Sequence, residues 1–147
     1  MKQIRIANVQ DIDNIKRFLG RADVSSEGID SIIDHFIVME DVDYNILATI
    51  GIERIEKDGL LRSLVITQGL DQTEVLALFK SVLSLAKKKE LEHLYLTTNI
   101  EASIQFFELL GFTKIDMCEL PTHLQTSDHI TQLCHSVEPM FMFIKVA

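Results

Sequence analysis

Several kinds of residue and segment are scarce in this sequence, and each scarcity excludes a class of protein. Only two residues are cysteines, Cys118 and Cys134, and they show neither the spacing of a metal site nor a disulfide framework. The five histidines show no metal-type clustering, so no metal is predicted. The opening stretch MKQIRIANVQDID lacks the apolar run of a signal peptide, and no stretch reaches the length of a membrane span. We therefore expect a cytoplasmic protein with free thiols and no membrane partner.

Positive charge is also in short supply. The chain carries 14 basic and 22 acidic residues, a formal net charge of −8 at pH 7. This charge argues against sequence-independent binding to nucleic acid or to an anionic membrane. The one run of cations, Lys87-Lys88-Lys89, closes a predicted helix, where it stabilises the negative end of the helix dipole.

Apolar residues, in contrast, are plentiful. They make up 47% of the chain, and the mean hydropathy is +0.18. A chain of 147 residues can bury a core that needs no crosslinks. Because repeats, linkers and low-complexity segments are missing, we treat residues 1–147 as a single domain.

The spacing of the apolar residues predicts an α/β (α+β) domain. The expected strands are residues 3–7, 36–39, 45–56, 60–66, 94–98, 112–115 and 138–146. The expected helices are one after Asn8 that ends at Gly20, one capped by Ser25 or Ser26, one from Val75 to the lysine run, and one from Asn99 to Gly111. Pro121 to Cys134 is expected to form one or two short helices. This order predicts a central, mixed, twisted sheet of six to seven strands flanked by helices. Its first half is antiparallel, with a hairpin turn at Lys57-Asp58-Gly59, and the helix after Ile66 joins two neighbouring parallel strands.

The stretch from Leu60 to Ala86 is central to the functional reading. Its strand breaks at Gly69 and leads into an amphipathic helix, an arrangement that often presents backbone N–H groups to a phosphate. However, the sequence has no glycine between Leu70 and Lys80. It has instead Asp71 and Glu74 in a D-x-x-E pattern, typical of a helix whose first N–H groups are capped by its own side chains. Each carboxylate would also repel a phosphate by on the order of 1 kcal/mol, so the local pattern favours an ordinary capped helix over a phosphate cradle.

The order of elements and the residues at their joints resemble the GNAT superfamily of acyl-CoA-dependent N-acetyltransferases. Three segments carry the resemblance: LLRSLVI at 60–66, LYLTTN at 94–99 and ASIQFFELLGF at 102–112. Within the superfamily, the chain is similar to small bacterial amino-acid acetyltransferases related to the N-acetylglutamate synthase and arsinothricin-resistance types. The supporting pieces are the GIE triplet at 51–53, Leu61 to Leu64, Leu96 to Thr98, and a tail with Pro121 and Leu133-Cys134.

The resemblance implies that acetyl-CoA is the co-substrate. The fourth and fifth strands are expected to splay apart, so that free backbone of the fourth pairs with the amide arms of acetyl-CoA, while the following helix start cradles the pyrophosphate. The implied cofactor-binding residues are Leu64, Val65, Ile66, Asp71, Gln72, Thr73, Glu74, Val75, Asn99 and Phe107. The family's arginine and glycines are absent from residues 71–76. Phe107 stands where the family commonly has a tyrosine acid; it packs either on the thioether of the cofactor or in the core.

Acetyl transfer to an amine needs a base, and the resemblance suggests Glu53 on the third strand. The alternative for Glu53 is a solvated strand residue paired with Arg54 or Lys57. Arg62 and Ser63 are candidates for binding a substrate carboxylate. Thr97 and Thr98 are expected near the acyl group, or else as backbone caps.

The sequence thus predicts an N-acetyltransferase in which the amine of a small molecule or amino acid attacks acetyl-CoA directly. Two alternatives stay open. One is a GNAT-like binding or regulatory domain without catalysis that has lost tight acetyl-CoA binding. The other is an enzyme that uses a different acyl carrier, or binds CoA by its pantetheine arm alone. The apolar final strand, Met140 to Phe143, fits either the interface of a homodimer or the ordinary edge of the sheet.

Overall fold

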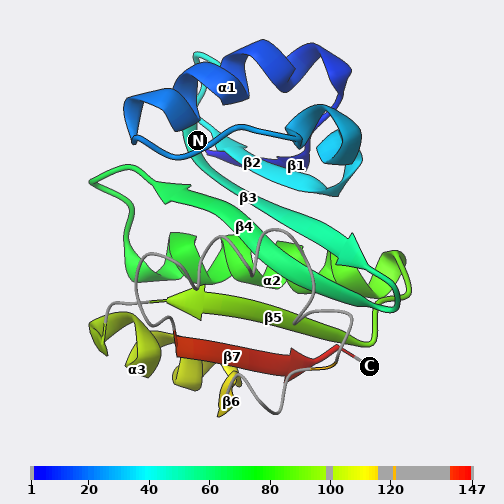
Figure 1. The fold of residues 1–147 in the computed structure, drawn as a ribbon. Coiled ribbons are helices and arrows are strands. Elements are labelled where there is room, and N and C mark those ends of the chain that lie inside the picture. Colours follow the sequence, from blue (N-terminus) through cyan, green and yellow to red (C-terminus); the bar gives the residue numbers. More distant parts are fainter. Residues whose placement is uncertain (1, 99–100, 116–120, 122–139, 147) are drawn as a thin grey trace.

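The computed structural model describes residues 2–98, 101–115, 121 and 140–146, and they form one α/β domain around a seven-stranded mixed sheet (Figure 1). The strands are β1 (Gln3–Ile6), β2 (Phe36–Glu40), β3 (Ile46–Ile55), β4 (Asp58–Ile66), β5 (His93–Thr98), β6 (Thr113–Ile115) and β7 (Met140–Lys145). The helices are η1 (Val9–Asp11), α1 (Ile12–Arg21), η2 (Ile29–His35), α2 (Gln72–Lys88) and α3 (Glu101–Leu110), of which η1 and η2 are 3₁₀ helices. The predicted short helices between Pro121 and Cys134 lie outside the described residues.

The strand order is β1-β2-β3-β4-β5-β7-β6. Strands β1 to β4 pair antiparallel, β4 and β5 pair parallel, and β7 is antiparallel to both β5 and β6. The predicted mixed sheet and the predicted parallel connection through α2 are therefore confirmed. None of the described helices is long and apolar enough to cross a membrane.

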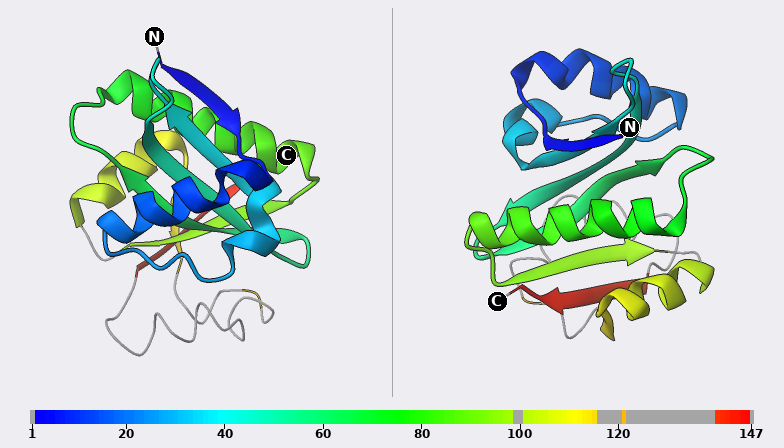
Figure 2. Two further views of the ribbon diagram at one scale, coloured as in Figure 1. Left: turned by 90° about the horizontal axis from the view of Figure 1, so that it is seen from above. Right: turned by 180° about the vertical axis from the view of Figure 1, so that it is seen from behind.

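Helices cover both faces of the sheet (Figure 2), and the buried apolar residues that the structure describes form three clusters. Helices α2 and α3 pack on one face, the α2 face, where alternate residues of the central strands are fully buried. Helix α1 and η2 cover the β1–β2 end of the opposite face, the α1 face. The core there is built from Ile15, Phe18 and Leu19 of α1, Ile29 of η2, and Phe36 and Val38 of β2.

Three local expectations are wrong for identifiable reasons. Helix α1 continues through Gly20 to Arg21, because an exposed glycine weakens a helix without ending it. Helix η2 begins after Gly28, which has φ 81°, rather than after a serine cap. The hairpin turn consists of Glu56 and Lys57, so that Asp58 and Gly59 already belong to β4. A Cβ at Gly59 would lie 2.6 Å from the side chain of Ile52 on β3, so this glycine permits close packing between side chains of neighbouring strands.

The final strand also differs from the expectation that it forms the edge of the sheet. β7 lies between β5 and β6, pairing with β5 from Thr98↔Met140 to His93↔Lys145. Phe141 and Met142 are 3% and 0% exposed, so they belong to the interior. β7 is therefore not an edge strand, and the homodimer stays a prediction.

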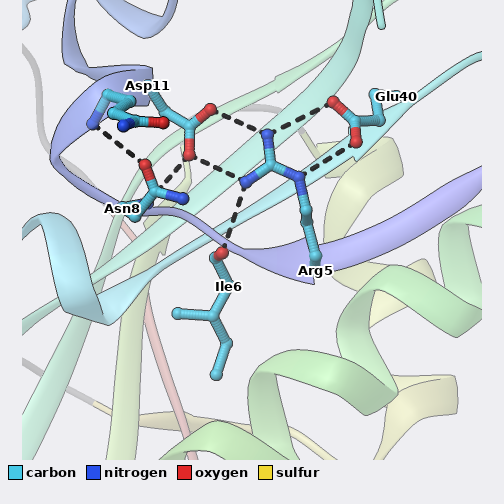
Figure 3. A network of polar contacts seen from close by, with 6 residues as sticks. Arg5, Ile6, Asn8, Asp11 and Glu40 are labelled. Atoms are coloured by element: carbon cyan, nitrogen blue, oxygen red, sulfur yellow. Dashed lines mark hydrogen bonds and ion pairs between the residues drawn. The ribbon is translucent and has the colours of Figure 1, made fainter.

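A partly buried ion network joins the first strand to the rest of the domain (Figure 3). The guanidinium of Arg5 donates to both carboxylate oxygens of Asp11, at 2.7 and 2.8 Å, and to those of Glu40, at 2.9 and 3.3 Å. Asp11 also accepts the backbone N–H of Asn8, and Asn8 caps η1 in return. The hydrogen bonds from Arg5 hold the pKa of Asp11 below its usual value. One arginine therefore fixes β1, β2 and the start of α1 relative to one another.

Replacing Asp11 by asparagine should destabilise the fold in a pH-dependent way. The folded-state pKa of Asp11 is lowered, so its contribution is complete above the unfolded pKa of about 3.9 and is lost as pH falls through the folded value. We expect Asp11→Asn to lower the free energy of unfolding by about 2 kcal/mol at pH 7, and the difference to shrink towards zero in acid. Urea unfolding, measured at several pH values from about 3 to about 7, tests this pH dependence because a carboxylate titrates within that range. The exposed Asp13→Asn variant is the control, and an equal pH dependence in both variants would contradict the prediction.

Candidate active site

The candidate site lies where β4 leaves β5. The two strands pair only at Gly59↔Leu94 and Leu60↔Tyr95, although each continues for several described residues. Beyond that point β4 stays paired with β3, and β5 stays paired with β7. Figure 1 shows the two strands diverging towards their carboxyl ends. The predicted splay is confirmed, and it leaves the β5-facing backbone of residues 61–66 without a strand partner in the sheet.

A bulge in β4 bends the strand away from β5. The register between β3 and β4 shifts between Thr49↔Val65 and Gly51↔Arg62, which leaves an extra residue in β4. Ser63 has φ 55°, in the left-handed region that few side chains adopt without cost. The hydroxyl of Thr49, which is fully buried, donates to the Ser63 carbonyl at 2.9 Å. This bond holds the bulge, and a bulge locally increases bend and twist.

Glu53 and Arg62 lie together on the α1 face, beside the splay. Their strands are antiparallel neighbours, and Arg62 Nη1 is 3.6 Å from Glu53 Oε1. Arg62 Nη2 also donates to the Glu27 carbonyl at 2.6 Å. The side chain of Arg62 is 10% exposed and that of Glu53 29% exposed. The structure therefore brings the predicted base and the predicted carboxylate-binding residue into one pair.

This pair has unused hydrogen-bonding capacity. Arg62 Nε and Glu53 Oε2 are buried and have no hydrogen-bond partner among the residues that the structure describes. Leaving a buried charged donor or acceptor unpaired costs roughly 1–3 kcal/mol or more, so this charged pair has an unmet hydrogen-bonding requirement. The alternative expected from the sequence, in which Glu53 pairs with Arg54 or Lys57, is wrong. Arg54 donates instead to the carbonyls of Glu56 and Lys89, and Lys57 pairs with Glu92.

The start of α2 is a capping box, as the D-x-x-E pattern predicts. The Asp71 carboxylate accepts the N–H of Glu74 at 2.8 Å, and Glu74 accepts the N–H of Asp71 at 3.1 Å. Glu74 also forms an ion pair with Lys2, and the hydrogen bond from Lys2 is the main reason why the pKa of Glu74 is lowered. Lys2 therefore balances one of the two carboxylates expected to repel a phosphate.

Two backbone donors remain at this helix start. Val75 N–H binds the Asp71 carbonyl, and Glu74 N–H is taken by the box. The N–H groups of Gln72 and Thr73 find no acceptor within residues 2–98, 101–115, 121 and 140–146. The helix dipole adds partial positive charge at this end.

The other predicted site residues fall into different surroundings. Leu64 is 37% exposed, whereas Val65 and Ile66 pack against the cores of opposite faces. Thr97 lies two residues after Tyr95 on β5, and Arg62 lies two residues after Leu60 on β4. Because alternate residues of a strand share a face, Thr97 and Arg62 both lie on the α1 face, beyond the last paired positions of the two strands. Thr98 ends β5, and Asn99 lies outside the described residues.

Phe107 is a core residue in this structure. It is 6% exposed, and its ring makes edge-to-face contacts with Phe79 of α2 at 5.5 Å, Phe106 at 5.6 Å and Phe112 at 5.8 Å between centroids. Such pairs stabilise the interior beyond their buried area. Of the two roles left open for this residue, the structure supports packing between α2 and α3.

Sequence reasoning missed several residues around the site. Thr49 and the Glu27 carbonyl act on Ser63 and Arg62 across 14 and 35 residues of chain, and no local pattern marks such partners. It also missed a cluster at the paired end of β4, where Asp58, Glu92 and His93 place potential ligand atoms within 4.8 Å of one another. His93 lies 3.3 Å from the buried Asp58, and Glu92 pairs with Lys57.

Comparison with solved structures defines the fold. The acetyltransferase of GNAT family from Staphylococcus aureus Mu50 matches with TM-score 0.76, 16% identity and 100% of both chains covered. N-acetylglutamate synthase from Neisseria gonorrhoeae, complexed with coenzyme A and N-acetyl-glutamate, matches with TM-score 0.79 and 18% identity over 100% of this chain, which spans 35% of that longer chain. Rv2747 from Mycobacterium tuberculosis, in complex with CoA and NLQ, matches with TM-score 0.76, 16% identity and 97% and 98% coverage. The chain has the GNAT acetyltransferase fold.

Comparison of sequences gives the family. No protein-family model matches the chain. The Bacillus subtilis (strain 168) protein "Uncharacterized protein YwlB" is 37% identical over 131 residues, which cover 88% of each chain. The chain belongs to the same family as YwlB.

The bulge at Ser63 can be tested by substitution. Ser63→Gly should be tolerated, because glycine adopts positive φ freely, whereas the β-branched Ser63→Val should lower the free energy of unfolding by about 1–3 kcal/mol. Thr49→Val, which loses the hydrogen bond to the Ser63 carbonyl, should cost about 1 kcal/mol. Urea denaturation measures all three. Equal stability of the glycine and valine variants would show that Ser63 is not held at positive φ.

Proposed function

We propose that the chain is an N-acyltransferase that transfers an acetyl group from acetyl-CoA to the amine of a small molecule or amino acid. The observation that carries the proposal is the splay of β4 from β5, with the Glu53–Arg62 pair directly beside it. The GNAT fold supports it, as do the CoA complexes of two similar structures. We propose further that the chain acts in the cytoplasm and resembles the amino-acid acetyltransferases of this fold.

Acetyl-CoA would bind along the open edge of β4. The backbone of Leu64, Val65 and Ile66 can pair with the amide groups of the pantetheine arm as a neighbouring strand would. The N–H groups of Gln72 and Thr73 would donate to the pyrophosphate, because free donors at a helix start favour anions. The capping box and its two carboxylates make this a weaker phosphate site than a glycine-rich loop.

The acceptor would bind at the Glu53–Arg62 pair. A carboxylate of the acceptor can accept a hydrogen bond from Arg62 Nε, which has no partner in the described part of the chain. Glu53 Oε2 can accept a proton from the acceptor ammonium, directly or through one water. The free amine then attacks the acetyl carbonyl carbon and a C–N bond forms. The nitrogen loses its extra proton to solvent, the C–S bond breaks, and CoA leaves as a thiolate that takes up a proton from solvent. No covalent enzyme intermediate is needed.

The absence of a tyrosine at position 107 fits this mechanism at a reduced rate. A phenylalanine cannot donate a proton to the leaving thiolate, and Phe107 is part of the aromatic core. A thiolate is a tolerable leaving group without a general acid, so a missing acid slows the reaction and does not prevent it.

A second candidate function is a GNAT-like binding or regulatory domain without catalysis. The observation in its favour is the capping box, which takes the N–H of Glu74 and places the unbalanced carboxylate of Asp71 at the start of α2. In this alternative the chain would not bind acetyl-CoA tightly. Acetyl-CoA binding therefore separates the two candidates.

We predict that acetyl-CoA stabilises the folded chain and that removing the Asp71 charge strengthens binding. A ligand at about 100 times its Kd stabilises by about 2.7 kcal/mol when it binds the folded state alone, which thermal shift and calorimetry detect. Asp71→Asn keeps an equally good cap and should lower the Kd about fivefold, as expected for the loss of about 1 kcal/mol of repulsion. Glu90→Gln, at the other end of α2, is the control. If acetyl-CoA stabilises neither wild type nor Asp71→Asn, the chain is not an acetyl-CoA-dependent enzyme.

The role of Glu53 predicts a specific kinetic defect. Glu53→Gln keeps the size of the side chain and should lower kcat about 100-fold or more, because a general base contributes roughly that factor. Stabilisation by acetyl-CoA should remain that of the wild type. Arg54→Gln, at the next position on β3, should change neither quantity. Unchanged kcat in Glu53→Gln, measured as CoA release with a panel of amino acids, would rule out Glu53 as the base.

A further inference from the structure

A groove lies between the edge strand β1 and helix α2. It has a volume of about 470 Å³, and we call it the β1–α2 groove. Its lining residues are Ile4, Arg5, Ile6 and Ile37 from β1 and β2, and Lys80, Ser81, Ser84, Leu85 and Lys88 from α2. The isoleucines and Leu85 form an apolar floor, and the lysines and serines form a polar wall. Figures 1 and 2 show β1 and α2 lying alongside each other in roughly the same direction.

The groove is positively charged in an otherwise acidic protein. The chain has a net charge of −8, yet no lining residue that the structure describes is acidic. Lys80 and Lys88 form no ion pair with any described residue, which is also true of Lys87, Lys114 and Lys145, whereas Lys2, Lys16, Lys57 and Lys89 are paired. The guanidinium of Arg5 is already used by Asp11 and Glu40. Two free cations on an apolar floor therefore favour an amphipathic anion.

The strand that borders the groove has an open edge. β1 is the first strand in the sheet order and pairs with β2 alone, so its outer N–H and C=O groups lack a strand partner. Ile6 is 42% exposed beside this edge. An extended peptide can satisfy such backbone groups by adding a strand, whereas a lipid or a nucleotide cannot.

The spacing of the lysines matches an extended chain. Lys80 and Lys88 are eight residues apart on α2, which corresponds to about 12 Å along the helix axis. In a strand, side chains at positions i and i+4 share a face and lie about 13 Å apart. Acidic side chains at i and i+4 can therefore reach both lysines, while an apolar side chain at i+2 faces the floor near Leu85.

We propose that the β1–α2 groove is a docking site for an extended acidic peptide segment of a partner protein. The segment adds a strand to the edge of β1 and carries acidic residues at i and i+4 with an apolar residue between them at i+2. The groove is separate from the proposed acetyl-CoA site, so this docking does not depend on catalysis.

The probe for the experiment is the peptide acetyl-Thr-Glu-Thr-Val-Thr-Glu-Thr-amide, titrated into the full chain. We expect amide NMR shifts confined to β1, β2 and α2, with a Kd below about 1 mM at low salt. A peptide with glutamine in place of both glutamates should bind at least about fivefold more weakly. So should a peptide with the second glutamate moved by one residue, because that side chain then faces away from α2. No binding at about 1 mM, or equal binding of the three peptides, would overturn the proposal.

Variants of the chain provide the matched test. Lys80→Gln/Lys88→Gln should weaken binding of the probe at least about fivefold, and Ser84→Phe should abolish it by filling the groove without a change in charge. Lys87→Gln/Lys114→Gln removes the same charge from exposed residues outside the groove and should bind like wild type. Equal weakening by both lysine pairs would mean non-specific attraction and would overturn the proposal.

Two other occupants have their own readouts. Binding to vesicles of phosphatidylcholine and phosphatidylserine that is lost in Lys80→Gln/Lys88→Gln would assign the groove to a membrane surface. A dimer in sedimentation equilibrium that is lost in the same variant would assign it to a second copy of the chain. Either result overturns the proposal, whereas wild-type chain that is monomeric and does not bind vesicles supports it.

Discussion

The short pairing between β4 and β5 is the constraint on which the candidate site depends. Two residue pairs hold these strands together, and after them each strand follows its other neighbour. The side chain missing from Gly59 allows Ile52, Leu91 and Leu94 to pack tightly where the strands meet. The bulge at Ser63, held by Thr49, turns β4 away. An opening with free strand backbone is thus produced by close packing at one end and a bend at the other.

The charged groups are arranged around this opening according to their surroundings. Arg62 is nearly buried and uses the Glu27 carbonyl and Glu53, while keeping one donor free. At the start of α2, the capping box stabilises the helix and competes with any phosphate for the same donors. Lys2 reduces that conflict by neutralising Glu74. In the proposed enzyme, phosphate binding at the start of α2 outweighs the competition from the capping box. In the proposed non-catalytic domain, the competition from the capping box is larger.

Much of the fold could be predicted from the sequence because its signals are local. The apolar run of β2, the long strand β3, the helical spacing of α2 and the D-x-x-E box each involve residues close together in the chain, and all four predictions are confirmed. The misses have longer-range causes. Gly59 is read as a turn residue although contacts from three other positions require it. One of the two possibilities left open for β7, the edge of the sheet, is wrong because β6 pairs beyond it.

The sequence by itself determined the mixed sheet, the parallel crossover through α2 and the capped, glycine-free start of that helix, because hydrophobic period and capping chemistry act between near neighbours. Only the tertiary structure decided that Glu53 pairs with Arg62 rather than with Arg54 or Lys57. It alone also brought Arg5 between Asp11 and Glu40, and left Lys80 and Lys88 unpaired beside an open strand edge. These arrangements join residues distant in the chain, and their geometry exists only once the strands have registered and the helices have packed.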